Sequence, residues 1–365
     1  MSITGYEIDF LPVGEKSSSG DAILFRYKEN GYFKVILIDG GHKESDVVKT
    51  SDTILNHLRK YYFPDATENN EMRIEHIICS HPDSDHLGGL QEIMEECDVG
   101  TFWINNPLDY TEKSDLAETT DNNAFSKADA DTVASLIRVA EKQGIMVKSP
   151  LQGKFIGPLL VASPSAEFYQ TLVKGELIRQ GGERASFKKL VLGAIQLILA
   201  NWNEDALFEF PATSVCNESS TVLFGSLMKD ERKILFTADA GIEALSRASI
   251  YLKENLDFQA GTLCFMQMPH HGGRRNVNRV VLDSLLGAKV TRGSDKRGSS
   301  FASVASKAYD FPKKAVTNAF TTRGYLCSAT KGESIRHKAG EMPSRDGWSP
   351  LTPIPFSDKV ETLDE

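Results

Sequence analysis

The sequence predicts an α/β fold in which β-sheets are covered by helices on their outer faces. Strand-like and helical segments alternate along the 365 residues, and several strand-like segments are grouped at the start. This pattern is typical of layered α/β architectures. No Pro- or Gly-rich linker divides the chain. We therefore predict one domain over residues 1–338, with a polar insertion near 105–123 and a polar, loosely attached extension over 339–365.

The first third of the chain predicts short strands followed by helices. Apolar and β-branched runs indicate strands at 6–13, 22–25, 33–38 and 73–80. Apolar residues at helical spacing indicate helices at 51–61 and from Asp85 onward. The strand at 33–38 ends in the turn signal Asp39-Gly40-Gly41, and the strand at 73–80 leads into His81.

The remainder of the chain continues this alternation. Amphipathic spacing predicts helices at 124–143, 167–178 and 241–256. Strands are predicted at 221–227, 233–237 and 262–268. The segment 190–200 is strongly apolar, and 202–220 has little periodicity and predicts an irregular loop.

Composition and charge restrict the class of protein. The net charge is −9, with 41% hydrophobic and 25% charged residues, which is ordinary for a globular protein. A protein that grips long duplex DNA nonspecifically is usually basic, so the balance argues against an extended nucleic-acid footprint. No run of eighteen apolar residues predicts a membrane-spanning helix.

The start of the chain and the cysteines predict a cytoplasmic location. Residues 1–9 lack the basic and then apolar pattern of a secretory signal. The five cysteines are scattered and odd in number, which favours buried free thiols in a reducing compartment.

The residues richest in potential chemistry lie on one short loop. His81, Asp83, Asp85 and His86 fall within six residues, directly after a predicted buried strand. Imidazole and carboxylate groups both bind Zn²⁺ and harder ions such as Mn²⁺. The alternative is a solvated acidic loop whose carboxylates favour the start of the next helix.

The sequence around this loop resembles a known family. The run His81-Pro82-Asp83-Ser84-Asp85-His86-Leu87-Gly88-Gly89 looks like the metallo-β-lactamase signature H-x-H-x-D-H, and the nearest likeness is to the branch with the ComEC/Rec2 competence nuclease domain. Further phrases of that branch follow in the family's order: Val13-Gly14-Glu15, Gly20-Asp21-Ala22-Ile23-Leu24, Leu37-Ile38-Asp39-Gly40-Gly41, Phe236-Thr237-Ala238-Asp239 and Pro269-His270-His271-Gly272-Gly273.

The resemblance implies an αββα sandwich with a metal site at one edge, between the two sheets. It implies that His81 and Asp83 bind one divalent ion, that Asp85 and His86 bind a second, and that Asp239 bridges them. His270 would complete a metal shell, with His271 as the next candidate. Asp39 would support the ligands through hydrogen bonds.

Two departures from the family pattern affect the metal prediction. Asp83 replaces the usual second histidine of the signature, which should favour Mn²⁺ over Zn²⁺ and could leave one ion rather than two. The chain also has no histidine between His86 and Asp239. The phrase Asn217-Glu218-Ser219-Ser220 fits the asparagine- and serine-containing phrase of the branch, or it is merely a turn.

A local excess of basic residues follows the second histidine pair. Positions 270–300 hold seven basic and two acidic residues, beginning with Arg274 and Arg275. Next to a metal site, arginines could hold phosphate oxygens. The alternative is a solvated helix face.

These features together predict a metal-dependent hydrolase that uses metal-activated water, with Asp85 and Asp239 as catalytic residues. The expected substrate is a phosphodiester in DNA, RNA or a cyclic nucleotide, and single-stranded nucleic acid suits the acidic chain better than duplex. The alternatives are hydrolysis of a thioester, lactone or β-lactam, and a noncatalytic metal-binding or sensor protein. The sequence leaves the oligomeric state and the physiological substrate open.

Overall fold

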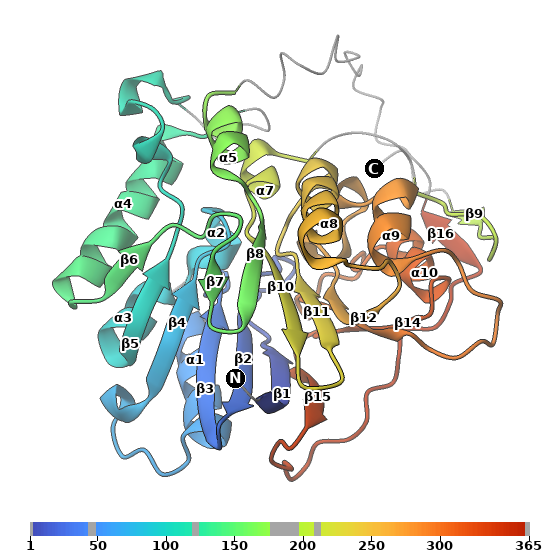
Figure 1. Cartoon of the computed structure of the whole chain (residues 1–365), viewed down its shortest axis with the longest axis horizontal. Coiled ribbons are helices and arrows are strands. Elements are labelled where there is room, and N and C mark those ends of the chain that lie inside the picture. Colours follow the sequence, from blue (N-terminus) through green and yellow to red (C-terminus); the bar gives the residue numbers. More distant parts are fainter. Residues whose placement is uncertain (1–2, 43–48, 119–123, 176–196, 208–212, 362–365) are drawn as a thin grey trace.

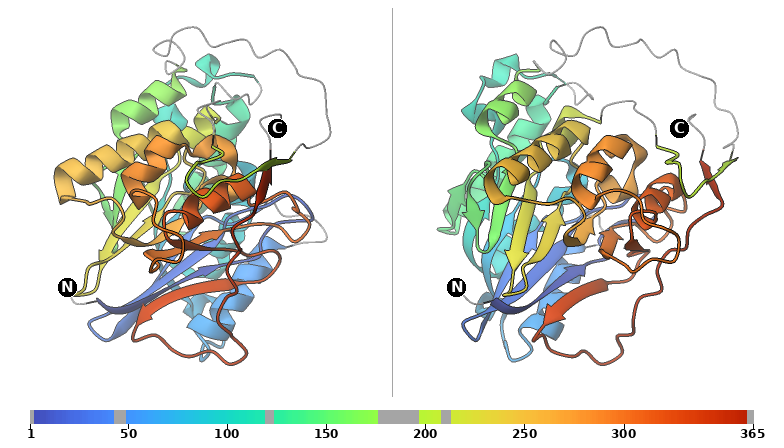
Figure 2. Two further views of the ribbon diagram at one scale, coloured as in Figure 1. Left: turned by 90° about the vertical axis from the view of Figure 1, so that its right-hand side faces the viewer. Right: turned by 45° about the vertical axis from the view of Figure 1, so that its right-hand side comes forward.

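The computed structural model describes residues 3–42, 49–118, 124–175, 197–207 and 213–361. Within these residues, two seven-stranded sheets stack face to face and helices cover their outer faces (Figures 1 and 2). This arrangement confirms the predicted αββα sandwich.

The first sheet has the order β15-β1-β2-β3-β4-β5-β6. It combines six strands from the N-terminal part of the chain with β15 from the C-terminal part. Strands β15, β1, β2 and β3 pair antiparallel, whereas β3 to β6 pair in parallel. The bounds are β1 (Ile3–Phe10), β2 (Ile23–Glu29), β3 (Tyr32–Ile38), β4 (Arg73–Ile78), β5 (Asp98–Trp103), β6 (Met146–Lys148) and β15 (Ile335–Gly340).

The second sheet has the order β14-β13-β12-β11-β10-β8-β7. Strands β11 to β14 pair in parallel, and β7, β8, β10 and β11 pair antiparallel. The bounds are β7 (Phe155–Ile156), β8 (Leu159–Ser163), β10 (Val222–Leu227), β11 (Arg232–Phe236), β12 (Leu263–Gln267), β13 (Gly298–Ala302) and β14 (Tyr325–Ala329). A separate ribbon pairs β9 (Leu197–Leu199) with β16 (Lys359–Glu361).

The helices divide between the two outer faces. Those belonging to the first half are α1 (Thr50–His57), α2 (Ser84–Leu87), α3 (Leu90–Glu96) and α4 (Lys127–Lys142). Those of the second half are α5 (Ala166–Val173), α7 (Val215–Glu218), α8 (Ile242–Leu256), α9 (Arg279–Leu286) and α10 (Lys314–Thr321). Short π or 3₁₀ turns lie at Leu58–Tyr62, Asn69–Glu71, Pro107–Asp109, Lys113–Asp115, His270–Gly272 and Arg274–Asn276.

Aromatic side chains fill the space between the two sheets. Phe25 of β2 meets Phe236 of β11 with ring centroids 5.9 Å apart, and Phe10 of β1 meets Phe265 of β12 at 6.0 Å. Separate apolar clusters lie under the helices on each outer face. Burial of these three apolar layers is the main source of stability.

The stacking brings the carboxyl ends of several strands to one edge. Asp39 follows β3 and the loop of His81 follows β4, while Asp239 follows β11 and His270 follows β12. The backbone N–H of Thr221, before β10, donates to the carbonyl of Ser80 at 3.0 Å and joins the two sheets there. In α/β proteins this edge is where ligands bind.

Several predicted elements have different bounds in the structure. The helix predicted at 167–178 ends at Val173, and its last three predicted residues lie outside the described part of the chain. The predicted loop at 202–220 contains α7, with 208–212 not described. Of the apolar segment 190–200, β9 is described and residues 190–196 are not. The insertion near 105–123 forms short 3₁₀ turns in its described residues.

The C-terminal segment differs from the loosely attached extension that we predicted over 339–365. The predicted boundary falls inside β15, which pairs with β1 from Gly5 to Phe10. Arg345 is buried and forms ion pairs with Glu7 at 3.1 Å and Asp9 at 2.7 Å. The Glu361 carboxylate accepts hydrogen bonds from the first backbone N–H groups of α10. Polar composition suggested a loose tail because these partners become visible only in the fold.

Among the described helices, none combines the length and the apolar character that a membrane crossing requires.

Candidate metal centre

The first arm of the site is the loop that connects β4 to α2. Its two histidines are buried, with His86 fully inaccessible and His81 3% exposed. The loop packs closely on residues 40–42: a Cβ on Gly88 would lie 1.9 Å from the carbonyl oxygen of His42. A side chain at 88 would therefore push the His86 loop outward.

The second arm carries Asp239 beyond the end of β11. Ala238 has a left-handed backbone (φ 44°), and the turn that it forms directs the Asp239 side chain to the edge between the sheets. Asp239 is 1% exposed. Its backbone carbonyl accepts a hydrogen bond from Asn276 Nδ2 at 2.7 Å, which ties this arm to the loop after β12.

The third arm presents two adjacent histidines in different directions. His270 (φ 49°) and His271 (φ 57°) are both in the left-handed region. Two consecutive left-handed residues are rare outside glycine and indicate a functional constraint on this loop. The His271 side chain is buried, whereas the His270 side chain is 38% exposed.

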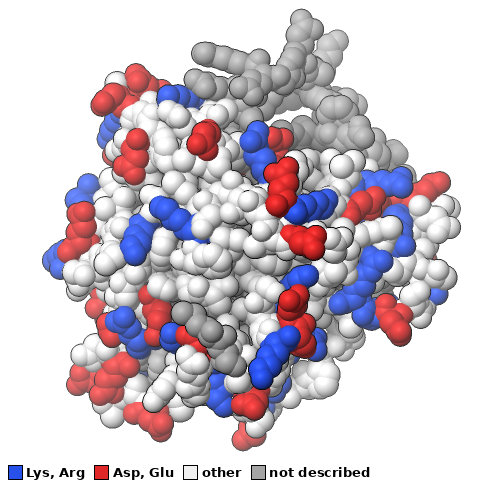
Figure 3. Space-filling view, viewed as in Figure 1, with Lys and Arg blue, Asp and Glu red and all other residues white. Residues whose placement is uncertain are grey.

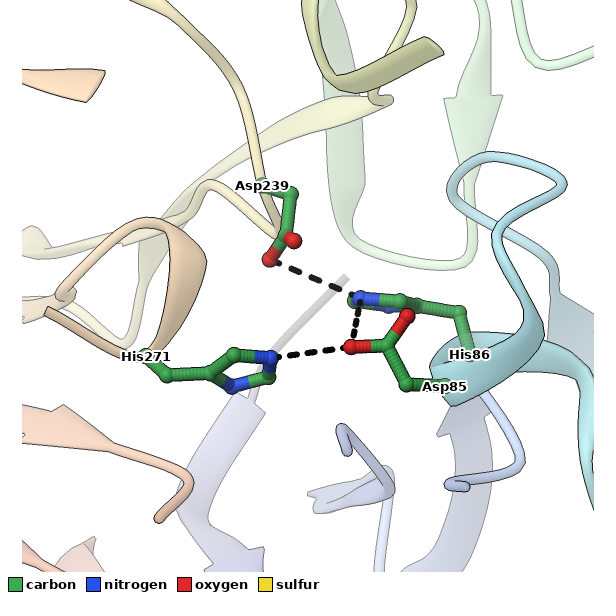
Figure 4. A group of neighbouring side chains, drawn as sticks. All are labelled: Asp85, His86, Asp239 and His271. Carbon is green, nitrogen blue, oxygen red and sulfur yellow. Dashed lines mark hydrogen bonds and ion pairs between the residues drawn. The ribbon is translucent and has the colours of Figure 1, made fainter. Parts of the chain in front are cut away.

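The three arms meet in a compact group of four side chains (Figure 4). One ligand atom from each of Asp85, His86, Asp239 and His271 lies within 4.8 Å of the others. His86 Nε2 is 3.5 Å from Asp239 Oδ1, and His271 Nε2 is 3.1 Å from Asp85 Oδ2. We call these four residues the central cluster.

Two further side-chain pairs adjoin the central cluster. His81 Nε2 lies 3.5 Å from Asp83 Oδ2, and the His81 and His86 ring centroids are 4.2 Å apart. His270 Nε2 lies 3.6 Å from Asp239 Oδ2, whereas His86 approaches the other oxygen, Oδ1. The six predicted ligands therefore lie around this edge, and His271, which we predicted only as the next candidate, lies there as well.

The order in which we ranked the two adjacent histidines differs from their placement. We predicted His270 as the ligand and His271 as the next candidate. The structure places His271 in the central cluster and His270 beside it, where His270 Nδ1 is 2.9 Å from Asn276 Oδ1. Backbone torsion angles decide this placement, and sequence spacing does not report them.

Buried carboxylates and hydroxyls support the imidazole rings from behind. Asp39 Oδ2 is 2.8 Å from His86 Nδ1 and accepts a hydrogen bond from Ser80 Oγ at 2.7 Å. Asp39 thus contacts a ring of the central cluster, as the resemblance implied. Such a carboxylate fixes the tautomer and leaves His86 Nε2 free to face the centre.

Asn217 also lies near the centre. Its Nδ2 donates to Thr213 Oγ1 at 2.9 Å and lies 3.5 Å from His270 Nδ1. The phrase Asn217-Glu218-Ser219-Ser220 therefore contains a residue beside the site, and its first two residues end the short helix α7.

Most of the basic residues at positions 270–300 that are described below contact other parts of the protein. Arg274 donates to the backbone carbonyls of Glu361 and Ala206, each at 3.0 Å. It therefore fastens the loop of His270 and His271 to the chain near β9 and β16, and the phosphate contact that we considered for it stays a prediction. Arg275 is exposed. Arg297 donates to three backbone carbonyls, and Lys289 pairs with Asp205 at 2.9 Å.

Sequence reasoning missed three residues that hold the arms together. Asp21 and Gln267 hydrogen-bond to each other, and Asn276 contacts both His270 and the backbone of Asp239. Asp21 belongs to the phrase Gly20-Asp21-Ala22-Ile23-Leu24, so the resemblance included this residue but implied no role for it. Nothing in the sequence pattern singled out Gln267 or Asn276.

The electrostatics of the central cluster favour a positive charge. Burial alone would lower the pKa of His271, but Asp239 and Asp85 outweigh it and raise the pKa to about 9. Burial alone would raise the pKa of Asp239, but His270 and His86 hold it well below its ordinary value. The pKa of His86 is raised well above its usual value for the same reason as that of His271. The carboxylates thus stay ionised at neutral pH.

A divalent cation fits this set of residues. His81 Nε2, His86 Nε2 and Asp239 Oδ1 are buried and have no hydrogen-bond partner in the described part of the chain. Buried polar atoms without partners are costly, and a cation bound beside them would supply the partner that they require. The mixed nitrogen and oxygen donors suit Zn²⁺ and Mn²⁺.

Comparison with known proteins gives a family match over the segment that holds the first arm. Residues 21–141 match the model of the Metallo-beta-lactamase superfamily. That segment contains Asp21, Asp39 and the loop from His81 to His86. No curated protein sequence matches the chain.

The solved structures found by comparison have low sequence identity and low TM-scores. Unliganded yeast PDE1 is 12% identical and has a TM-score of 0.42, covering 92% of this chain and 99% of that one. The metallo-beta-lactamase SMB-1 in complex with mercaptoacetic acid is 10% identical with a TM-score of 0.35, covering 76% and 90%. AidC, a dizinc quorum-quenching lactonase, is 16% identical with a TM-score of 0.30, covering 65% and 68%.

Proposed function

We propose that this chain, whose residues 21–141 match the model of the Metallo-beta-lactamase superfamily, is a hydrolase that cleaves phosphodiester bonds with the help of divalent ions held at the central cluster. The observation that carries this proposal is the convergence of Asp85, His86, Asp239 and His271 from three distant segments. Burying four ionisable groups together costs free energy, and a bound cation would offset this cost by pairing with the carboxylates and the imidazole nitrogens.

The proposed ligands fall into two groups around Asp239. Asp85, His86 and His271 face Asp239 Oδ1 and would hold the first ion. His270 lies beside Asp239 Oδ2, and His81 and Asp83 lie beside each other next to His86; these three would hold a second ion more weakly because they do not belong to the compact group. When bound, such ions lower the pKa of water and polarise a phosphoryl oxygen.

The protein's own residues would position the reactants. Asp85 belongs to the central cluster and also lines a cavity of about 540 Å³ beside it, so its carboxylate can accept a hydrogen bond from the attacking water. Asp239 offers one oxygen to each side and sets the spacing between them. Burial of His86 and His271 excludes bulk water, which strengthens the electrostatic stabilisation of charge on the substrate.

The phosphodiester class is supported by the ComEC/Rec2-like phrases that run from Val13 to Gly273 in the family's order. The substrate would be short or single-stranded, since acidic and basic side chains are interspersed on the face drawn in Figure 3. Arg275, exposed and four residues after His271, is the candidate for a phosphate contact. A single such arginine suits one phosphodiester better than a long polyanion.

Hydrolysis of a neutral ester, thioester, lactone or β-lactam is the second candidate, and one observation favours it. The cavity beside Asp85 is lined by acidic, neutral polar and apolar residues, and its described lining includes no lysine or arginine. Such a lining attracts a neutral substrate more readily than an anionic one.

The test is a turnover assay with metal-loaded protein. With Mn²⁺ or Zn²⁺, we expect hydrolysis of bis-p-nitrophenyl phosphate and of single-stranded DNA. Asp85→Ala and Asp239→Ala should lower kcat/KM by about a hundredfold or more, whereas Asp98→Ala, in an exposed pair, should leave it unchanged.

Each contrary outcome has a distinct meaning. Intact phosphodiesters combined with turnover of nitrocefin or a thioester would favour the second candidate. Bound metal without turnover of any of these compounds would indicate a noncatalytic metal-binding or sensor protein.

A further inference from the structure

Gln267 lies at the end of β12 and links the two halves of the candidate site. Its side chain is 1% exposed. Its Oε1 accepts hydrogen bonds from the backbone N–H groups of Thr237 at 3.0 Å and Ala238 at 2.9 Å, directly before Asp239. Its Nε2 donates to Asp21 Oδ2 at 2.8 Å. One amide therefore joins the turn of the second sheet that presents Asp239 to the loop of the first sheet that enters β2.

Asp21 in turn lies behind His271. Asp21 Oδ1 is 4.0 Å from His271 Nδ1, and both buried atoms have no hydrogen-bond partner in the described part of the chain. The other ring nitrogen, Nε2, faces Asp85 in the central cluster. A negative charge behind the ring favours the proton on Nδ1 and leaves the Nε2 lone pair pointing at the centre. Asp39 also lies behind a ring of the central cluster, but closer, with Oδ2 at 2.8 Å from His86 Nδ1.

We propose that Gln267 and Asp21 are positioning residues for metal binding. The amide of Gln267 fixes Asp21 behind His271 and fixes the turn of Asp239, so that ligands from the two sheets keep one spacing. This inference rests on the proposed metal site, and it does not depend on which substrate is cleaved.

The contacts of Gln267 require an amide. Its oxygen must accept from two backbone N–H groups while its nitrogen donates to a carboxylate, and only an amide side chain offers both functions at one end. Glutamate at 267 could accept the same two hydrogen bonds, but it would place a second negative charge against Asp21 in a buried site.

Cobalt binding by the purified full chain tests the inference without relying on activity. The protein is stripped with a chelator and titrated with Co²⁺, whose visible absorption reports the ligand geometry and whose affinity is measured against a competing indicator. We expect Gln267→Glu to weaken Co²⁺ binding by about 10- to 100-fold and to change the spectrum. Asp21→Asn keeps the hydrogen bond to Gln267 and should also weaken binding, because it removes the charge behind His271.

Two further variants separate positioning from general stability. The double variant Asp21→Asn/Gln267→Glu re-forms the hydrogen bond with its polarity reversed, and it should bind Co²⁺ about tenfold more tightly than Gln267→Glu alone. Gln152→Glu is the matched control, because Gln152 Nε2 donates to the carbonyl of Ala162 before the cis proline of another loop. It should leave Co²⁺ affinity unchanged.

The inference is overturned if Asp21→Asn and Gln267→Glu, both folded by circular dichroism, bind Co²⁺ within twofold of the unaltered protein. It is also overturned if the loss of Co²⁺ affinity in the double variant equals the sum of the losses, in free energy, of the two single variants. If Gln267→Glu fails to fold, the Co²⁺ affinity of Asp21→Asn alone decides whether the inference holds. If the unaltered protein binds no divalent ion, the proposed function fails together with this inference. If the unaltered protein binds Co²⁺ and the variants bind it equally well, only this inference fails.

Discussion

Adjacent residues on one loop face different carboxylates in this protein. His271 is buried against Asp85, whereas His270 is half-exposed beside the outer oxygen of Asp239. Because both residues have left-handed backbones, the ring of His271 points inward while the ring of His270 stays at the surface. The two histidines should therefore contribute unequally to metal binding.

This inequality gives a prediction at the scale of single residues. His271→Ala should weaken binding of Zn²⁺ or Mn²⁺ by about 10- to 100-fold, since it removes a ligand from the central cluster. His270→Ala should weaken binding less and should lower the number of ions bound per chain. Equilibrium dialysis with elemental analysis measures both quantities. A larger loss of affinity in His270→Ala than in His271→Ala would contradict the assignment.

Arg274 and Arg275 also differ in role despite being neighbours. Arg274→Met removes two hydrogen bonds to backbone carbonyls, so we expect the free energy of unfolding to fall by about 1–2 kcal/mol. Arg275→Met should leave stability nearly unchanged and raise KM for a phosphodiester, because Arg275 is exposed near the site. Urea denaturation and steady-state kinetics separate the two effects. Equal loss of stability in both variants would argue against the fastening role of Arg274.

At the scale of elements, the C-terminal segment closes the outer face of the first sheet. Glu7 and Asp9 of β1 are fully buried, and their charges are compensated by Arg26, Arg336 and Arg345. Two of these arginines come from β15 and the segment after it. The first sheet therefore depends on residues more than three hundred positions away in the sequence.

Removing one of these arginines should be costly. Arg345→Met leaves two buried carboxylates short of a partner, and we expect a loss of about 3–5 kcal/mol in the free energy of unfolding. The matched control is Arg73→Met, which breaks an exposed pair with Asp98 and should cost less than about 1 kcal/mol. Chemical denaturation of both variants measures the difference. A cost at Arg345 no greater than that at Arg73 would show that the C-terminal segment is loosely attached after all.

At the scale of the whole molecule, the space between the sheets contains a histidine. The His337 ring lies among the rings of Phe265, Tyr6 and Phe301, with centroids 5.0, 5.8 and 6.4 Å away. Burial, assisted by the charge of Arg232, lowers the pKa of His337 to about 4. An unfolded chain has the ordinary histidine pKa of about 6.5.

This difference predicts acid sensitivity. Between about pH 6.5 and 4 the unfolded chain binds a proton that the folded chain does not, so stability falls as the pH falls through this window. The contribution of His337 is at most about 3 kcal/mol. His337→Phe should retain more of its neutral-pH stability at pH 4.5 than the unaltered protein does. Thermal or urea unfolding at pH 7.5 and 4.5 checks this, and an identical pH dependence in both proteins would contradict it.

The sequence by itself determined the layers and the first arm of the site. Alternation of apolar residues located strands such as β3 and helices such as α4 and α8, because burial of one face imposes a period on the chain. Four polar residues on one loop marked the candidate ligands from His81 to His86, because local spacing is visible in sequence.

Only the tertiary structure decided which distant groups meet. The placement of His271 ahead of His270, the use of Arg274 as a fastener, the burial of Arg345 and the link through Gln267 all depend on contacts between segments far apart in the chain. Such contacts follow from backbone turns and from how two sheets stack, and residue order carries no direct record of either.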